Sequence, residues 1–346
     1  MNEFLLDKET SEKIEWDDFL SLIEVRSHLG LQYKNTLKPF LPGREKELKK
    51  ELLRTQKFSQ FILKHPDWLR LFSSNIQELK DLRNSLKKAQ EGGRLTVTEI
   101  FEIKRLLFII ENIKVMMKSK ELSWLASFRP KGAPLLFRIL NKGNQSPQSF
   151  YIVDEYSSLL KRKRREKLKL YAKLEEEKEK ISQELKRIGL KPSDLEEISL
   201  ARDASQVSFM RSHPLFYLKS ENTHTLVFAY RFSSDALEWK NKIKEIEIEE
   251  EREEGEVCKR LSQEISKFVK ILIPDLEKLA YLDFLLAKSE ASLRYQGVMP
   301  DILKKKGKTS LFMREGLHLP LALRLREKGY EFHPLSIRLK SGAALL

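Results

Sequence analysis

Apolar residues recur every three or four positions through the N-terminal third of the chain, which is the spacing of amphipathic helices. Gly30 follows the first such pattern and is predicted to stop its helix. A turn at Leu41-Pro42-Gly43 separates that helix from the next one. Residues 17 to about 143 are therefore interpreted as one helical core. Its predicted helices cover 16–29, 45–65, 77–90, 98–118 and, briefly, 122–128.

A second pattern is longer and more charged. After a polar loop at 141–147 and a short β-prone stretch at 150–153, apolar residues recur at threes and fours from 157 to 188 among many Lys and Glu. This pattern is typical of a coiled-coil seam, and about 32 residues at 1.5 Å rise make an arm of about 48 Å. The seam positions are Leu160, Tyr171, Leu174, Ile181, Leu185 and Ile188.

The arm is predicted to turn back on itself. Gly189 and Pro192 end it, and the segments 206–209 and 224–230 are predicted strands of a small cap. A second long helix over 234–272 follows, and Pro274 is predicted to terminate it. The last helix, 276–295, is apolar on several sides and is expected to pack within the core.

These elements predict a mainly α fold: a helical core with a long antiparallel two-helix lever and a small β tip. The expected organisation is a helical core over 1–148, lever helices over 149–275 with the β tip at about 190–234, and a core return helix over 276–300. Composition agrees, because 13 Gly and 12 Pro among 34% charged residues suit long helices better than a β-sandwich or an open α/β sheet. An apolar content of 41% in 346 residues is enough for sizeable cores.

No targeting or membrane-spanning segment is predicted. The N-terminus lacks a basic start followed by an apolar run, and no apolar stretch approaches the ~20 residues needed to cross a bilayer. We therefore expect a cytoplasmic protein with no membrane contact.

The formal charge of +14 is compatible with nucleic acid or with any acidic partner surface, and it does not decide between them. The charge is uneven, with a basic run at 161–165 and an acidic run at 249–254. Charge runs are usually solvated helix faces. On a lever helix the basic run favours a solvated or protein-docking face, and contact with phosphates is the alternative. The candidate contact residues are Lys161, Arg162, Lys163, Arg164 and Arg165.

Residue types that carry catalytic or metal chemistry occur without the spacing that such chemistry needs. The six histidines show no metal-ligand spacing, and none pairs in sequence with a plausible nucleophile and acid. Cys258 is the single cysteine, so it cannot form an internal disulfide. Carboxylates are abundant, but no catalytic pair stands out among them. We therefore predict no catalytic, cofactor-binding or metal-binding residues.

One string is similar to a phosphate-binding loop. Gly307-Lys308-Thr309-Ser310 matches the end of G-x-x-x-x-G-K-[ST], but Ile302 occupies the position of the first glycine. The string follows three lysines, 304–306, and no clear strand precedes it. We therefore predict that no phosphate-binding loop forms there.

Several short stretches of the sequence, taken in chain order, form a recognisable series of motifs. Residues 82–89 and the sequence Gly92-Gly93-Arg94-Leu95 combine a helix, a double-glycine turn and the start of the next helix, and 151–160 leads into the first lever helix. The acidic run 247–254 is then followed by Leu282-Asp283-Phe284-Leu285-Leu286-Ala287-Lys288. In this order the stretches resemble the core and lever of the MutS family, especially its second bacterial subfamily, which lacks the mismatch-recognition module.

The C-terminal part resembles the run into the nucleotide-binding domain of that family. Residues 312–318 and 334–346 match the run, and we interpret 301–346 as the truncated start of an ATPase-like domain, because the Gly-rich loop would come next. The resemblance then implies that the chain is not an ATPase by itself and works with a separate MutS-like ATPase subunit. The Phe-x-Glu wedge of the repair branch is absent, and about 45 residues at 190–234 leave little room for the larger DNA clamp of that branch.

Split relatives of this kind are associated, by resemblance, with the two-subunit reactivase of lysine 5,6-aminomutase. The resemblance implies an ATP-dependent chaperone that releases damaged cobalamin from its client. The chain itself is expected to bind no cofactor, and ATP and adenosylcobalamin are implied only through the ATPase and the aminomutase. Two alternatives stay open. One is a DNA-binding core and lever module of a repair or anti-recombination ATPase, with weak nucleic-acid contact, and the other is a fragment of a longer ATPase.

Overall fold

The computed structural model describes residues 8–144, 146, 149–193, 196–302 and 310–340. Within these residues the fold is mainly α, as predicted. It contains two small sheets, of which only the one in the tip was predicted. The chain divides into two units. Unit 1 comprises Met1–Glu91, Glu102–Ile139 and Ile265–Leu346, and unit 2 comprises Gly92–Phe101 and Leu140–Glu264.

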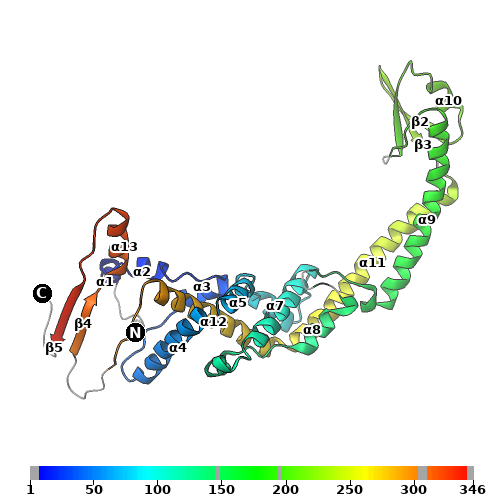
Figure 1. The fold of residues 1–346 in the computed structure, drawn as a ribbon. Coiled ribbons are helices and arrows are strands. Elements are labelled where there is room, and N and C mark those ends of the chain that lie inside the picture. The colour runs from blue at the N-terminus through cyan, green and yellow to red at the C-terminus, as the bar shows by residue number, and fades with distance from the viewer. Residues whose placement is uncertain (1–7, 145, 147–148, 194–195, 303–309, 341–346) are drawn as a thin grey trace. The chain divides into compact units, whose positions relative to one another are not determined.

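Unit 1 is built around α12 (Val269–Arg294), which is buried along most of its length and contacts α3, α4, α6 and η1 (Figure 1). Apolar residues occupy several sides of α12, as a helix surrounded by other helices requires. The other helices that lie wholly or mainly in this unit are α1 (Lys8–Lys13), α2 (Trp16–Ser21), α3 (His28–Asn35), α4 (Glu45–Lys64), α5 (Pro66–Gln77), α6 (Arg83–Gln90), α7 (Val97–Met116), η1 (Lys120–Phe128) and α8 (Pro134–Leu140).

The prediction of one helix over 16–29, stopped by Gly30, was wrong. α2 ends at Ser21, and α3 begins at His28 with Ser27 as its N-cap, because the Ser27 hydroxyl oxygen accepts a hydrogen bond from the Gly30 N–H at 3.0 Å. Gly30 lies inside α3, where a Cβ atom would come within 2.1 Å of the Asp283 carboxylate. The glycine therefore permits the close approach of α3 to α12.

Pro274 was predicted to terminate a helix over 234–272, and this was also wrong. α11 (Ser234–Ser266) ends earlier, Phe268 is the N-cap of the next helix, and Pro274 lies inside α12. Proline removes one backbone hydrogen bond from a helix. Burial of Leu272 and Leu276 on either side of it stabilises the continued helix and offsets that loss.

Three further predictions differ in detail. The helix predicted over 77–90 starts only at Arg83, whose N–H donates to the Asp81 carboxylate at 3.1 Å. The segment predicted as a helix over 122–128 is the 3₁₀ helix η1, and the β-prone stretch 150–153 forms no strand. The helices predicted over 45–65 and 98–118 are confirmed as α4 and α7, while α5 was not predicted.

Unit 2 contains the two long helices of the predicted lever, α9 (Ser158–Arg187) and α11, which lie side by side (Figure 1). The short helices η2 (Lys142–Asn144) and η3 (Asp154–Tyr156) precede α9. The chain segment that connects α9 to α11 forms the tip, whose antiparallel sheet has the strand order β1-β3-β2, with Ile198 opposite Phe228. Its elements are β1 (Glu197–Ala201), α10 (Val207–Ser212), β2 (Phe216–Glu221) and β3 (Thr225–Tyr230).

Of the two strands predicted in the tip, 224–230 is confirmed as β3, and 206–209 was wrong because it lies in α10. Met210 is fully buried in the tip core and Val207 packs against that core. The three-residue spacing of these two side chains puts them on one face of a helix, which explains the structure that forms. β1 and β2 were not predicted.

The C-terminal segment contains β4 (Ser310–Gly316), α13 (Leu319–Glu327) and β5 (Leu335–Lys340). The two strands pair antiparallel, with Phe312 opposite Arg338. Residues 307–309 of the string similar to a phosphate-binding loop lie outside the described residues, as do 304–306, 341–346 and parts of the predicted loop 141–147. Among the helices in the described part of the chain, none is long and apolar enough to cross a membrane.

Candidate functional site on the lever helices

An apolar seam joins the two lever helices. Leu174 of α9 packs with Ala236 and Ile243 of α11, and all three are buried. Leu160, Leu174 and Ile181 are buried seam positions at heptad intervals, as predicted. Tyr171 is different, because its side chain is partly exposed and its hydroxyl donates to a Glu247 carboxylate oxygen at 3.1 Å. Tyr171 therefore belongs to the polar edge of the seam.

Beside the seam lies a ladder of ion pairs between α9 and α11. Lys163 pairs with Glu249, and Lys167 pairs with Glu250 at 2.5 Å. Arg164 pairs with Glu254 at 2.6 Å. The basic run of α9 and the acidic run of α11 are therefore partners of each other, and we call these three pairs the charged ladder. The sequence shows both runs but does not show that they meet.

Arg164 is the most connected residue of the charged ladder. Its guanidinium also donates to Asp154 Oδ1 and to the Ile152 carbonyl oxygen, both at 2.9 Å. Burial alone would lower the pKa of Arg164, but the carboxylates of Asp154 and Glu254 raise it above its ordinary value. Arg164 thus fixes the segment that leads into α9 to both lever helices.

The candidate contact residues of α9 separate into two groups. Lys163 and Arg164 face α11 and are used by the charged ladder. The exposed residues Lys161, Arg162 and Arg165 form no ion pair within the part of the chain that the structure describes. One part of the basic run therefore has a structural role, and the other part remains available for a partner protein or for phosphates.

Another face of α11 borders a groove of about 520 Å³ that sequence reasoning missed. Arg94, in the turn before α7, lies over Gly255 of α11, where a Cβ atom would come within 2.8 Å of Arg94 Nη1. A glycine within a long charged helix is the signal that could have indicated this close approach. The groove is lined by Arg94, Thr96, Val97, Ile248, Arg252 and Gly255, among others.

In unit 1 the aspartate of the Leu282-Asp283-Phe284 motif has a structural role. Asp283 is fully buried and accepts hydrogen bonds from the N–H groups of Arg26 at 3.0 Å and Ser27 at 2.8 Å, and from the Ser27 hydroxyl at 2.6 Å. Burial raises the pKa of the Asp283 carboxyl, against the effect of these donors and of the nearby Arg26 guanidinium. Asp283 therefore ties the start of α3 to α12.

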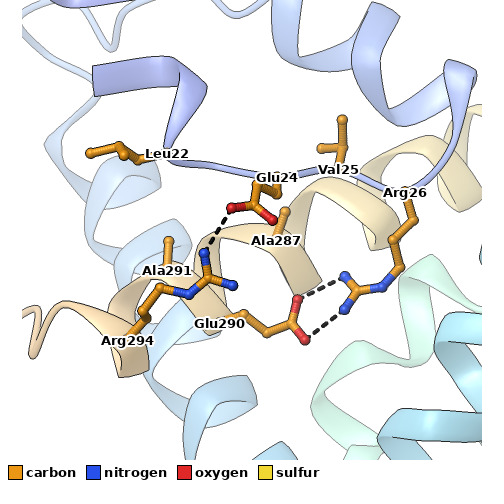
Figure 2. A pocket seen from close by; sticks show the side chains of 8 residues that line it. All are labelled: Leu22, Glu24, Val25, Arg26, Ala287, Glu290, Ala291 and Arg294. Carbon is orange, nitrogen blue, oxygen red and sulfur yellow. Dashed lines mark hydrogen bonds and ion pairs between the residues drawn. The ribbon is translucent and has the colours of Figure 1, made fainter. Parts of the chain in front are cut away.

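Next to Asp283 lies a hollow of about 220 Å³, bordered by two ion pairs (Figure 2). Arg26 makes a bidentate pair with Glu290 of α12, with both distances 2.7 Å. Arg294 pairs with Glu24 at 2.7 Å. These pairs hold the segment before α3 across α12, and both guanidinium groups are already occupied by carboxylates. The geometry is that of an anchor and not of a ligand site.

Two other carboxylates act in the same way on α12. Asp275 is fully buried and accepts from the N–H groups of Lys131 at 2.9 Å and Gly132 at 2.7 Å. Glu51 of α4 pairs with Lys288 and accepts from the Tyr281 hydroxyl at 3.0 Å. Burial alone would raise the pKa of Glu51, but Lys288, Tyr281 and Arg54 together lower it below its ordinary value.

Within the described residues, no group of three or more His, Cys, Asp or Glu side chains could hold a metal ion. Cys258 is buried in α11, and burial raises the pKa of its thiol, which disfavours the reactive thiolate.

Comparison with known proteins gives one informative match, and no family model matches the chain. Endonuclease MutS2 of Caldanaerobacter subterraneus subsp. tengcongensis is 25% identical over 272 residues. The match covers 75% of this chain and 34% of the relative, so the chain spans about a third of that protein. Together with the mainly α core and lever, this distant match supports a relationship to the MutS family.

Proposed function

We propose that this chain is the core and lever of a MutS-type machine and that a MutS-like ATPase drives its movement. The observation that carries the proposal is the double connection of α9 to α11, by the apolar seam and by the charged ladder. Two helices connected at several levels bend less than one, so the pair is suited to transmit a displacement. α9 has 30 residues, which is about 45 Å at 1.5 Å per residue.

In this proposal the chain does not hydrolyse ATP by itself. Its one string similar to a phosphate-binding loop has Ile302 where the loop needs its first glycine. ATP then acts through the partner, and it moves the lever only if the partner binds two lever arrangements with different affinity in its ATP-bound state. Calorimetry of the chain with ATP is expected to give no binding. Micromolar binding abolished by Lys308→Ala would contradict this.

We further propose that the client is adenosylcobalamin-dependent lysine 5,6-aminomutase and that the complex is a reactivating chaperone. Ejecting damaged cobalamin requires an interface to open, which a stiff lever can accomplish mechanically. The tip supports a protein client, because Arg202, Arg211 and Lys219 are paired with Glu221 and Glu197, which leaves only Lys191 and Arg231 without an ion pair among its described Lys and Arg residues. A tip that held a duplex would need unpaired cations. ATP and adenosylcobalamin enter this scheme only through the two partners.

Co-purification followed by a turnover assay tests this proposal. The chain is expected to form a specific complex with a separately encoded MutS-like ATPase. The pair is expected to restore turnover of inactivated lysine aminomutase when ATP and adenosylcobalamin are added. Recovery without this chain, or no recovery with both proteins, would rule out the reactivase role. The ATPase with a substitution in its own phosphate-binding loop is the matched control.

A second candidate function is a DNA-binding core and lever module of a repair or anti-recombination ATPase. Two observations favour it: the matched relative is named an endonuclease, and Lys161, Arg162 and Arg165 are exposed on α9. Its affinity for duplex should then fall steeply with salt, because neutralised phosphates release counterions. Arg162→Ala with Arg165→Ala should weaken it further, whereas Arg164 is unsuitable because its loss also breaks the charged ladder. Tight duplex binding at physiological salt, without aminomutase recovery, would favour this candidate.

A further inference from the structure

The net positive charge of the chain does not lie on the lever. Unit 2 contains 25 Lys and Arg and 25 Asp and Glu, so its formal charge is zero. Unit 1 contains 40 Lys and Arg and 26 Asp and Glu, so it carries the whole formal charge of +14. Charges of opposite sign cancel at distances beyond their separation, and the net charge then sets the attraction to a polyanion. Unit 1 is therefore the part of the molecule that attracts one.

Within unit 1, α4 concentrates exposed lysines on one face. The adjacent face packs into the core through Phe58, Phe61 and Ile62, and the helix contacts α12 (Figure 1). Gln56 and Gln60 are exposed between the lysines. The exposed cations of this face, which we call the α4 lysine face, are Lys46, Lys49, Lys50, Lys57 and Lys64.

Carboxylates neutralise the α4 lysine face only near its start, where Glu47 interacts electrostatically with Lys50. The acidic residues of α4 are Glu45, Glu47 and Glu51, all in its first two turns, and the stretch from 52 to 64 has none. Glu47 is occupied by Arg44, and Glu51 points into the core toward Lys288. In the described part of the chain the lysines at 46, 49, 50 and 64 form no ion pair.

The basic surface continues beyond the end of α4. His65, which follows the helix, pairs with Glu121 of η1 at 3.0 Å. Lys120, the residue before Glu121, is exposed and has no ion pair among the described residues. Lys57 lies over the Trp124 ring, with 6.0 Å from Nζ to the ring centroid. These two contacts place η1 beside the C-terminal half of α4, where Lys120 adds a cation and the exposed carboxylate of Glu121 is paired with His65.

We propose that the α4 lysine face binds the phosphate backbone of duplex nucleic acid. From Lys46 to Lys64 the face spans about 27 Å at 1.5 Å per residue, the length of about eight base pairs. Every exposed polar group between residues 49 and 64 of this face belongs to Lys or Gln, and both side chains donate to phosphate oxygens. The binding is independent of base sequence, since nothing on a straight row of lysines reads base edges.

An acidic protein surface is the competing occupant, and the composition of the face disfavours it. The buried parts of protein interfaces are enriched in aromatic residues, Met and Arg and depleted in Lys. The α4 lysine face has five lysines and no exposed aromatic residue on the helix, and its one arginine, Arg54, is bound to Glu51 at 3.1 Å. Leu63 is its one strongly exposed apolar side chain within the helix. The inference does not depend on the client or the ATPase partner of the lever.

Fluorescence anisotropy of a labelled 20-base-pair duplex with the full chain tests the proposal over about 50 to 200 mM salt. The unmodified chain should bind at low salt with a steep negative slope of log affinity against log salt. The variant Lys46→Gln, Lys50→Gln, Lys57→Gln, Lys64→Gln should bind at least about tenfold more weakly at low salt. Its slope should be shallower by about 3 to 4, or about one for each phosphate that the variant no longer neutralises.

The matched control removes the same four charges from the lever: Lys161→Gln, Arg162→Gln, Arg165→Gln, Lys169→Gln. It should change affinity by no more than about threefold, because those cations stand in a neutral unit. Circular dichroism shows that both variants keep their helix content. Absence of duplex binding by the unmodified chain at 50 mM salt overturns the proposal, and so does equal loss in both variants. Poly-glutamate that displaces the duplex as well as unlabelled DNA does would assign the face to an acidic protein instead.

Discussion

Acidic side chains hold both the lever and the core helix α12 to their neighbours, but the exposed fraction of those side chains differs greatly between the two regions. In the charged ladder the carboxylates remain partly exposed to solvent, since the Glu249 side chain is 54% exposed and that of Glu254 is 38% exposed. On α12, Asp275 and Asp283 are 0% exposed and accept hydrogen bonds from backbone N–H groups of distant segments. The lever is therefore held by several contacts of modest strength, and the core by a few that are individually strong.

The energies explain why the two regions differ. A solvated ion pair is worth about 0–1 kcal/mol, because both partners keep much of their hydration when they separate. A buried donor that loses its acceptor costs about 1–3 kcal/mol, because water cannot replace the lost bond. The lever should therefore tolerate the loss of one pair, whereas unit 1 should not tolerate the loss of Asp283.

The largest effect is expected from Asp283→Ala. It leaves the buried N–H group of Ser27 and the partly buried N–H group of Arg26 without an acceptor, and the free energy of unfolding of unit 1 should fall by about 3 kcal/mol. Urea denaturation followed by fluorescence reports this change, since Trp68 and Trp124 both lie in unit 1. Asp67→Ala is the matched control, because its exposed carboxylate pairs only with an equally exposed Arg70. A similar loss in both variants would contradict the comparison.

A smaller effect is expected from Arg164→Ala. The substitution removes the links to Asp154, Glu254 and the Ile152 carbonyl, which should cost unit 2 about 1–1.5 kcal/mol. Hydrogen exchange should increase at the start of α9 and leave the tip unchanged. Loss of protection throughout α9 and α11 would mean that the lever depends on this one residue.

The pH dependence of stability should show the partly buried pair of Glu51 and Lys288. The pKa of Glu51 is lowered in the folded chain, so its contribution is present above its ordinary value of 4.5 and is lost as pH falls through the folded-state value. Unfolding free energies measured from pH 7 to pH 3 should therefore decrease less steeply in Glu51→Gln than in the unmodified chain. Equal slopes would show that the carboxylate does not stabilise the core through its charge.

The smallest effect is expected from Lys161→Ala with Arg162→Ala and Arg165→Ala. These exposed side chains form no ion pair within the described residues, so stability should change by no more than about 0.5 kcal/mol. Any loss of partner binding in this variant is then due to the surface itself. Thermal denaturation that shifts by as much as in Arg164→Ala would show that the outward part of the basic run is also structural.

Helices with a regular apolar period could be predicted from the sequence, and their boundaries less well. α4, α7 and α9 follow their patterns closely, because the spacing of threes and fours over many residues leaves few alternatives. The predictions at Gly30 and Pro274 failed for a common reason. Each residue was interpreted from its local propensity, while the contact with Asp283 and the burial of Leu272 and Leu276 lie beyond the reach of that propensity.

The charged residues of the candidate site could be predicted from the sequence, but their pairing across the two lever helices could not. The basic run 161–165 and the acidic run 249–254 are evident in the sequence. Arg164 and Glu254 lie 90 residues apart, so nothing local indicates that they pair or that Arg162 and Arg165 point away. The same limit applies to Gly255, because the need for a glycine at this position follows from the close approach of Arg94, which is distant in the sequence.

The sequence by itself determined the helical class, the two long lever helices and the position of the charge blocks, because periodicity and charge order are local properties of a chain. Tertiary structure alone decided which cations are used by the fold and which remain exposed. It also gave Asp283 and Asp275 their partners, the backbone N–H groups of residues 26, 27, 131 and 132. The physical reason is that burial, and with it the strength of a hydrogen bond or ion pair, depends on neighbours that the sequence places far away.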